Sequence, residues 1–139
     1  MRHRSGRVLW GVLGAACIGG CAQTQPFTVG QTNLEAIWSF GNLSIDVVPP
    51  RGGTATLVAA AESALQGRGY VQRWRASTAT DPAVVKARRA GAGTEGLDDA
   101  TVSLYARATS TTIEVRVGLF GNEDESRAIL SDMLQRLGY

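Results

Sequence analysis

Five short segments after position 40 alternate apolar and polar residues with a period of two, the spacing of a strand with one buried side. They are 43–47, Tyr70–Arg75, Ala83–Arg89, 101–108 and 112–117. In 43–47, 101–108 and 112–117 the apolar residues, Ala106 and Ala108 included, are expected to face the core. The residues expected to face outward are Ser44, Asp46, Ser103, Tyr105, Arg107, Glu114 and Arg116. Ser110-Thr111 predicts a tight hairpin between the last two segments. In the segment Tyr70–Arg75 either side could face the core, and its aromatic residues favour the side of Tyr70, Gln72 and Trp74.

Two longer segments repeat their apolar residues with the period of an amphipathic helix. The first, 55–68, follows Thr54 as the expected N-cap and is ended by Gly67 and Gly69. The second follows Asn122 as N-cap, with Glu125 at the capping-box position. The apolar stripes are Leu57, Val58, Ala61, Ala64 and Leu65 in the first helix, and Ile129, Leu130, Met133, Leu134 and Leu137 in the second.

The order of these elements is β-α-β-β-β-β-α, which predicts the α+β class. Consecutive strands with short links favour an antiparallel sheet of about five strands. Each helix has a single apolar stripe, so both helices are expected on one face of the sheet, which leaves the other face open.

The first 21 residues have the pattern of a bacterial lipoprotein leader. A basic start is followed by an apolar run of about eleven residues (8–18), which is too short to span a membrane permanently. Ile18-Gly19-Gly20-Cys21 resembles a lipobox, whose cysteine is acylated and becomes the first mature residue. Cys17 is a rival, but no aliphatic residue stands three positions before it. We expect a signal peptide over 1–20, a lipid-anchored and mostly irregular tether over 21–39, and a small α+β domain over 40–139.

Net charge separates the leader from the rest of the chain. The whole sequence has a formal charge of +2, but three of its basic residues lie in the first seven positions. Without the leader, eleven basic residues stand against twelve acids, a net charge of −1. The basic character belongs to the leader, and nucleic acid is therefore not an expected partner.

The residue types after Cys21 exclude much catalytic chemistry. His3 is the only histidine, and no cysteine follows Cys21, so imidazole and thiolate sites for catalysis or zinc are missing. The carboxylates Glu123-Asp124-Glu125 and Asp132 fit helix-dipole matching better than a metal or acid-base cluster. The glycine pattern at 91–96 lacks the strand and helix of a dinucleotide site. We expect no cofactor, no metal and no enzyme activity.

A non-catalytic binding or structural module of the cell envelope is the favoured function, and a small carboxylate-dependent envelope hydrolase is the alternative. The open sheet face is the expected binding surface. Arg73, Arg75 and Arg107 are its candidate contacts if the partner is anionic, for example an envelope protein or an anionic polymer. Lys86, Arg88 and Arg89 are further candidates for such a cationic patch.

The segment Val117-Gly118-Leu119-Phe120-Gly121-Asn122-Glu123 resembles the closing signature of a family of small, uncharacterised bacterial lipoproteins with a domain of unknown function. Phe40-Gly41-Asn42-Leu43 is similar to that family's entry into its first strand, and Gly69-Tyr70 to a shared step. The resemblance implies an envelope location and this domain plan, but no activity. Ala22, rather than Asp, follows the lipobox cysteine, which in Gram-negative lipoproteins implies sorting to the outer membrane, facing the periplasm.

Overall fold

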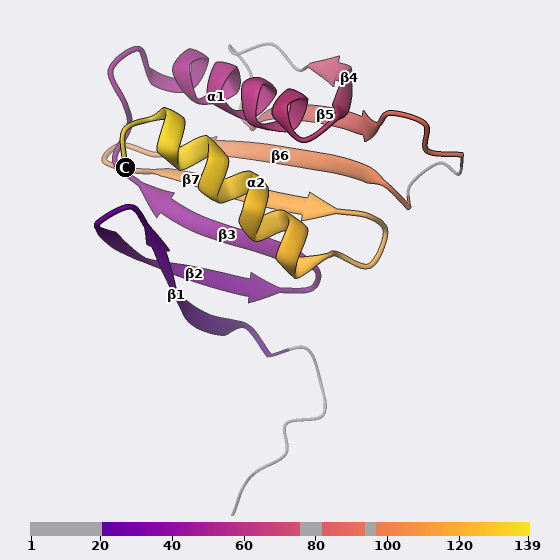
Figure 1. Cartoon of the computed structure of the whole chain (residues 1–139). Helices are drawn as coiled ribbons and strands as arrows, with labels where there is room; N and C mark the ends of the chain where they lie inside the picture. The colour runs from indigo at the N-terminus through magenta and orange to yellow at the C-terminus, as the bar shows by residue number, and fades with distance from the viewer. Residues whose placement is uncertain (1–20, 76–81, 94–96) are drawn as a thin grey trace, which may run out of the picture.

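The computed structural model describes residues 21–75, 82–93 and 97–139, without the side chains of Trp74 and Arg75. Seven strands form one sheet in the order β1-β2-β3-β7-β6-β5-β4 (Figure 1). Every neighbouring pair is antiparallel. The strands are β1 (Gln23–Val29), β2 (Thr32–Ser39), β3 (Asn42–Val47), β4 (Tyr70–Arg75), β5 (Ala83–Arg89), β6 (Asp99–Ala106) and β7 (Thr111–Val117).

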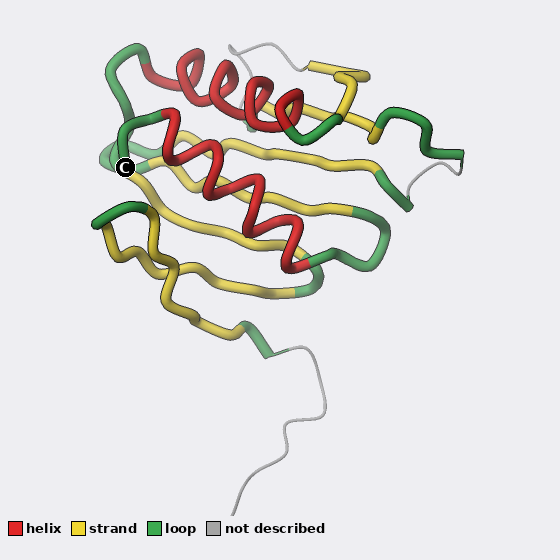
Figure 2. The backbone as a smooth tube through the Cα atoms, in the orientation of Figure 1, coloured by secondary structure: helices red, strands yellow, loops and turns green. Residues whose placement is uncertain are grey.

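Two helices, α1 (Gly53–Gly67) and α2 (Glu123–Arg136), lie side by side on the same face of this sheet (Figure 2). Helix α1 packs over β4, β5 and β6, and α2 packs over β7, β3 and β1. The predicted α+β class, the antiparallel sheet and the single helix-covered face are confirmed.

Of the described helices, neither is long and apolar enough to cross a membrane.

The sheet has two strands more than the expected five, and both come from the segment predicted as an irregular tether. That prediction was wrong for β1 and β2, which form a hairpin through the two-residue turn Gly30-Gln31. Pro26 and the many Gln and Thr residues made β1 look irregular. Proline is tolerated there because β1 is the edge strand of the sheet.

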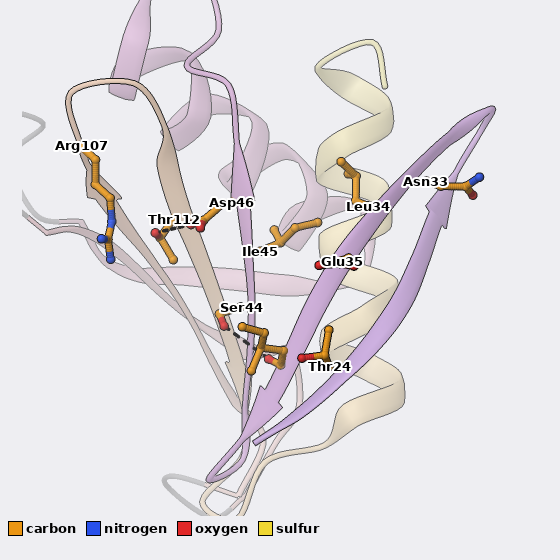
Figure 3. Close-up of a pocket in the computed structure, with 10 residues that line it drawn as sticks. Thr24, Asn33, Leu34, Glu35, Ser44, Ile45, Asp46, Arg107 and Thr112 are labelled. Atoms are coloured by element: carbon orange, nitrogen blue, oxygen red, sulfur yellow. Dashed lines mark hydrogen bonds between the residues drawn. The ribbon is translucent and has the colours of Figure 1, made fainter. Parts of the chain in front are cut away.

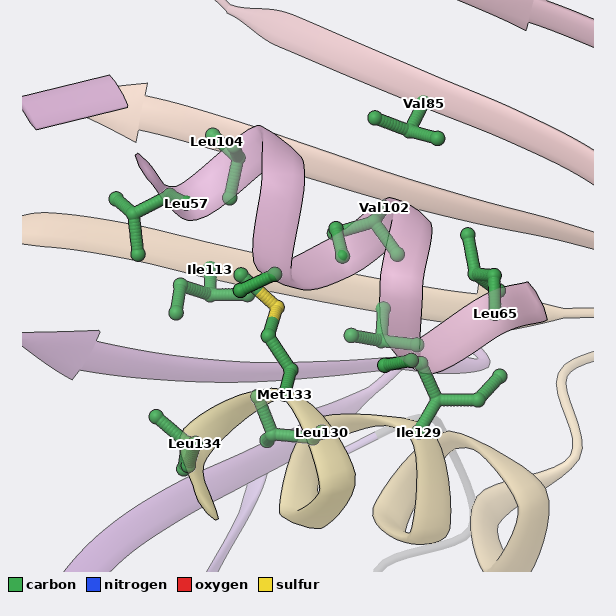
Figure 4. Close-up of a cluster of buried hydrophobic side chains, with 14 of the residues drawn as sticks. Leu57, Leu65, Val85, Val102, Leu104, Ile113, Ile129, Leu130, Met133 and Leu134 are labelled. Atoms are coloured by element: carbon green, nitrogen blue, oxygen red, sulfur yellow. The ribbon is translucent and has the colours of Figure 1, made fainter. Parts of the chain in front are cut away.

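The core lies between the two helices and the sheet (Figure 4). Side chains of both predicted helix stripes meet the inward side chains of the strands, and Leu57, Leu104, Ile113 and Met133 are fully buried among them. The predicted inward sides of β3 and β7 are confirmed, as is Tyr70 on β4. Ala106 and Ala108, which were expected inward, are exposed because β6 ends at Ala106.

The helix ends agree with the sequence only in part. Asn122 caps α2, since its side chain accepts a hydrogen bond of 3.1 Å from the Glu125 N–H. The expected cap at Thr54 is wrong: α1 starts after Gly52, which adopts a left-handed conformation without a side-chain hydrogen bond. Gly69, with a φ of 81°, follows the end of α1 as predicted.

Candidate functional site

The helix-free face of the sheet opens where the β1–β2 hairpin diverges from β3. Strand β2 pairs with β1 from Thr32 to Trp38, but with β3 only from Ala36 to Ser39. Before Ala36 the two strands separate and enclose a hollow with a volume of about 590 Å³ (Figure 3). We call this hollow the fork. The residues that line it are Thr24, Asn33, Leu34, Glu35, Ile37, Ser44, Ile45, Asp46, Arg107 and Thr112.

Seven of the ten residues that line the fork are polar, and they carry both signs of charge. Glu35 and Asp46 supply two exposed carboxylates from neighbouring strands, and Arg107 supplies a guanidinium from the turn after β6. The Asp46 carboxylate accepts a hydrogen bond from the Thr112 hydroxyl on β7 (Figure 3). Apolar surface comes from Ile37 and from the inward residues of β2 and β3. Such a hollow can hold a polar segment with positive and negative groups together.

Most of the residues predicted to face outward do lie on the helix-free side. Ser44, Asp46, Ser103, Glu114 and Arg116 alternate with buried neighbours on β3, β6 and β7. A second hollow of about 270 Å³ is lined by residues of the same face: Asn42, Lys86, Thr101, Ser103, Glu114 and Arg116. The open face is therefore a solvent-exposed surface with polar residues and charges of both signs, rather than an apolar surface.

The cationic surface expected from Arg73, Arg75 and Arg107 is not one compact patch. Arg73 lies at the register shift between Gln72 and Trp74 of β4, and Trp74 pairs with Lys86 of β5. Lys86 in turn pairs with Thr101 on β6. Arg107 follows Thr101 by six residues, or about 20 Å along the strand direction. Arg73 and Arg107 are both exposed, and the Arg75 side chain lies outside the described part of the chain.

Two of the other basic candidates are engaged in ion pairs. Arg88 contacts the Asp99 carboxylate at 2.9 Å. Arg89 belongs to the helix-covered side, where its guanidinium contacts the Glu125 carboxylate at 2.8 Å and lies over the Tyr70 ring. Placing Arg89 on the open face was therefore wrong: it shares the inward side of β5 with Val85 and Ala87.

Glu125 is the centre of a polar cluster that sequence reasoning missed. It was expected to cap its own helix, but its carboxylate accepts hydrogen bonds from the Arg68 guanidinium at 2.9 and 3.2 Å. The Tyr70 hydroxyl donates to the same carboxylate at 3.3 Å. Arg68 also contacts Asp132 at 3.2 Å. The cluster joins the end of α1, β4 and β5 to α2.

The charges in this cluster stabilise one another, as expected for an ion-pair network with a structural role. The hydrogen bonds and charge of Arg68 lower the pKa of Glu125, and Arg89 adds to this effect. The pKa of Arg68 is raised, chiefly by its hydrogen bond to Glu125. Burial raises the pKa of the Tyr70 hydroxyl. Because the Glu125 carboxylate is kept ionised by two guanidinium groups, it is poorly suited to act as a catalytic acid.

The remaining carboxylates do not form a metal centre in the part of the chain that the structure describes. There, no group of three or more His, Cys, Asp or Glu residues could hold a metal ion. Asp99 is paired with Arg88, and Glu123 with Arg127 at 3.0 Å on its own helix. The glycine-rich stretch 91–96 falls partly outside the described residues.

Cys21, the predicted lipidation site, is exposed and has a free thiol. It lies two residues before β1, and the leader 1–20 that would precede cleavage lies outside the described residues. The first residue of β1, Gln23, pairs with Trp38 at the end of β2. Cys21 is therefore at the end of the sheet that also contains the β2–β3 turn (Figure 1).

No model of a known protein family matches the chain, and no curated protein matches it.

Proposed function

We propose that this protein is a lipoprotein of the cell envelope, anchored by lipid on Cys21, whose folded domain is a non-catalytic binding module. The binding surface is the helix-free face of the sheet, with the fork as its centre. The observation that carries the proposal is the fork itself, a hollow of about 590 Å³ with charged, polar and apolar lining residues, on a face that neither helix covers.

The anchor is supported by the sequence before the first strand. An apolar run of signal-peptide length ends at Ile18-Gly19-Gly20-Cys21, and no second cysteine follows. An exposed cysteine two residues before the folded domain can be reached by acylating enzymes at the membrane surface. With Ala22 next to it, an outer-membrane location facing the periplasm is part of the proposal for a Gram-negative host.

The chemistry of the fork favours a polypeptide segment of an envelope protein as the partner. Glu35 and Asp46 would repel a uniformly anionic polymer, although Arg107 alone would attract one. A peptide with both charges can match the carboxylates and the guanidinium at once. An anionic polymer that lies across the open face, between Arg73 and Arg107, is the weaker alternative.

A carboxylate-dependent hydrolase remains the second candidate, because Glu35 and Asp46 line one hollow. Such an enzyme needs two carboxyl groups in different environments, one held protonated and the other ionised. The side chains of Glu35 and Asp46 are both exposed to solvent on the same face of the sheet. Their surroundings therefore give no reason for one to be protonated while the other is ionised. The binding module is therefore the better account of the fork.

Site-specific photo-crosslinking in cells tests the binding surface. A photoreactive amino acid replaces Asn33 in the fork or, as a control, Gln66 on the exposed side of α1, both in the full lipidated chain. We expect a discrete crosslinked partner from position 33 and none from position 66. Arg107→Ala should weaken that crosslink, whereas Arg51→Ala, another exposed arginine, should not. Crosslinks only from position 66 would move the site to the helices and contradict the proposal.

A further inference from the structure

Large apolar side chains are exposed at one end of the sheet. Phe40, in the β2–β3 turn, is 79% exposed, and Phe120, in the loop between β7 and α2, is 84% exposed. Leu119 lies next to Phe120, and Leu97 lies in the loop before β6; both are more than half exposed. We call these four residues the apolar end. Neither the core nor the fork uses them.

The three segments that carry the apolar end are held together by close backbone contacts. A Cβ atom on Gly41 would stand 2.6 Å from the Phe120 carbonyl oxygen, and one on Gly118 would stand 2.7 Å from the Leu97 carbonyl oxygen. Such approaches leave no room for a side chain at either glycine. Phe40 has a φ of 49°, the only positive value among the described residues other than glycine. A strained backbone thus presents a largely exposed aromatic ring, a feature that solubility alone would not favour.

Cys21 lies at this same end of the domain. Gln23 pairs with Trp38, and Ser39 pairs with Asn42 across the turn that contains Phe40. The pairing with β2 continues through Gln25–Val29, so β1 is fixed in the sheet. Only Cys21 and Ala22 are therefore free to move relative to the domain. Two extended residues reach about 7 Å at most. If lipid is attached at Cys21, the first residue of the sheet must therefore lie at the level of the lipid headgroups, which are on the order of 5–7 Å deep.

From this geometry we propose that the apolar end rests directly on the bilayer, with Phe40 and Phe120 inserted between the headgroups. The inference depends on the proposed anchoring through Cys21. Aromatic side chains favour this interfacial layer, and the lipid on Cys21 would keep them within reach of it. Only Cys21 and Ala22 separate the lipid from β1, so the anchored domain is already close to the membrane surface. Docking of the apolar end therefore costs little additional translational entropy.

The charges around the apolar end indicate what kind of membrane contact this is. Asp98 and Asp124 are exposed nearby, and the Arg116 guanidinium, which donates to the Leu119 carbonyl, supplies a charge of the opposite sign. Because these charges largely offset one another, the attraction to the membrane must come from apolar burial. Docking is therefore expected on zwitterionic and mixed membranes alike, with little dependence on salt. The fork lies toward the opposite ends of β2 and β3, so a docked domain would turn it toward the aqueous space.

A fluorescent label on a single new cysteine tests the docked orientation. Once Cys21 is acylated, Phe120→Cys or Val48→Cys supplies the only free thiol of the mature chain. Val48 is 72% exposed and follows β3 at the opposite end, which makes it a matched control. The lipidated full-length proteins are placed in vesicles of phosphatidylethanolamine and phosphatidylglycerol, with or without a quencher on the acyl chains.

We expect the label at position 120 to lose most of its fluorescence to the acyl-chain quencher, and the label at position 48 to lose almost none. Adding Phe40→Asn and Leu119→Ser should reduce the docked fraction roughly tenfold, because both apolar contacts are removed. Asparagine tolerates the left-handed backbone at position 40, so this variant should still fold.

Three results would overturn the inference, and they have different meanings. Equal, weak quenching at both positions would show a domain that does not dock. Protection of position 120 from a water-soluble quencher without quenching by lipid would assign the apolar end to a protein partner or a second copy. Mass spectrometry of the same sample reports acylation: a chain without lipid on Cys21 would refute the proposed function as well, whereas an acylated chain that fails to dock refutes only this inference.

Discussion

The Arg68 guanidinium holds the Glu125 carboxylate through two hydrogen bonds of 2.9 and 3.2 Å, between residues 57 positions apart in the sequence. Arg68 caps the end of α1, and Glu125 lies in the first turn of α2. Both side chains are largely shielded from water, with 29% and 16% of their surface exposed. This pair therefore fixes the two helices relative to each other and to the strands beneath them.

Glu125→Gln should lower the free energy of unfolding by about 1–3 kcal/mol, because two guanidinium groups would lose their shielded anion. Urea unfolding of the soluble domain measures this loss. Glu123→Gln is the matched control, since its pair with Arg127 lies within one helix and contributes less than about 0.5 kcal/mol. Equal effects of the two substitutions would contradict a special role for Glu125.

The same pair predicts a loss of stability in acid. The pKa of Glu125 is lowered in the folded protein, so its contribution is complete above the ordinary glutamate value of about 4.3 and declines as the pH falls through the lower folded value. Thermal melts between pH 6 and 2 should therefore converge for the wild type and Glu125→Gln as the pH falls. A difference that persists unchanged in acid would show that the carboxylate charge is not what stabilises the fold.

The sequence predicted the strands that alternate strictly, such as those that carry Ile45 and Ile113, because their inward residues all reach one core. It failed for β1, where only Phe27 and Val29 are buried and Pro26 suggests a break. An edge strand such as β1 is held by hydrogen bonds to one neighbouring strand and leaves its other edge unpaired. It can therefore form with little apolar patterning. The alternation of inward residues Leu34, Ala36 and Trp38 on β2 was the signal that could have revealed the hairpin.

Removing β1 should destabilise the domain although the strand looks irregular in the sequence. A soluble chain that starts at Gln31 loses the buried Phe27 and Val29, a cost of about 3–6 kcal/mol relative to one that starts at Ala22. Such a loss is a large part of the stability of a small domain. Urea unfolding of the two chains measures it. Equal midpoints would mean that residues 22–30 are a tether after all.

Gly121→Ala tests the close contact behind the apolar end. A Cβ atom there would collide with the backbone of Gly41, so the substitution should cost several kcal/mol. Gly91→Ala is the matched control, because Gly91 has nearly the same φ, 80° against 81°, but open space around it. It should cost only about 1–2 kcal/mol, the strain of a left-handed alanine. Equal losses would mean that the two turns do not need to touch.

The candidate site could be predicted only as a face of the sheet. Alternation identified the outward residues, including Ser44, Asp46 and Arg107, and hence the uncovered side. The fork could not be predicted, because it depends on where β2 leaves β3, and strand divergence has no local signature in the sequence. The cluster around Glu125 was missed for a similar reason, since its partners Arg68 and Arg89 are brought near only by the fold.

Both the proposed function and the proposed membrane contact depend on lipid at Cys21, which metabolic labelling with a fatty-acid probe detects. The wild type, Cys17→Ser and Cys21→Ser are expressed as full-length chains, and the label on each protein is measured after removal of free lipid. We predict full labelling of the wild type and of Cys17→Ser, and none of Cys21→Ser. A Cys21→Ser protein that still carries the label, together with an unlabelled Cys17→Ser protein, would place the anchor at Cys17 and contradict this account.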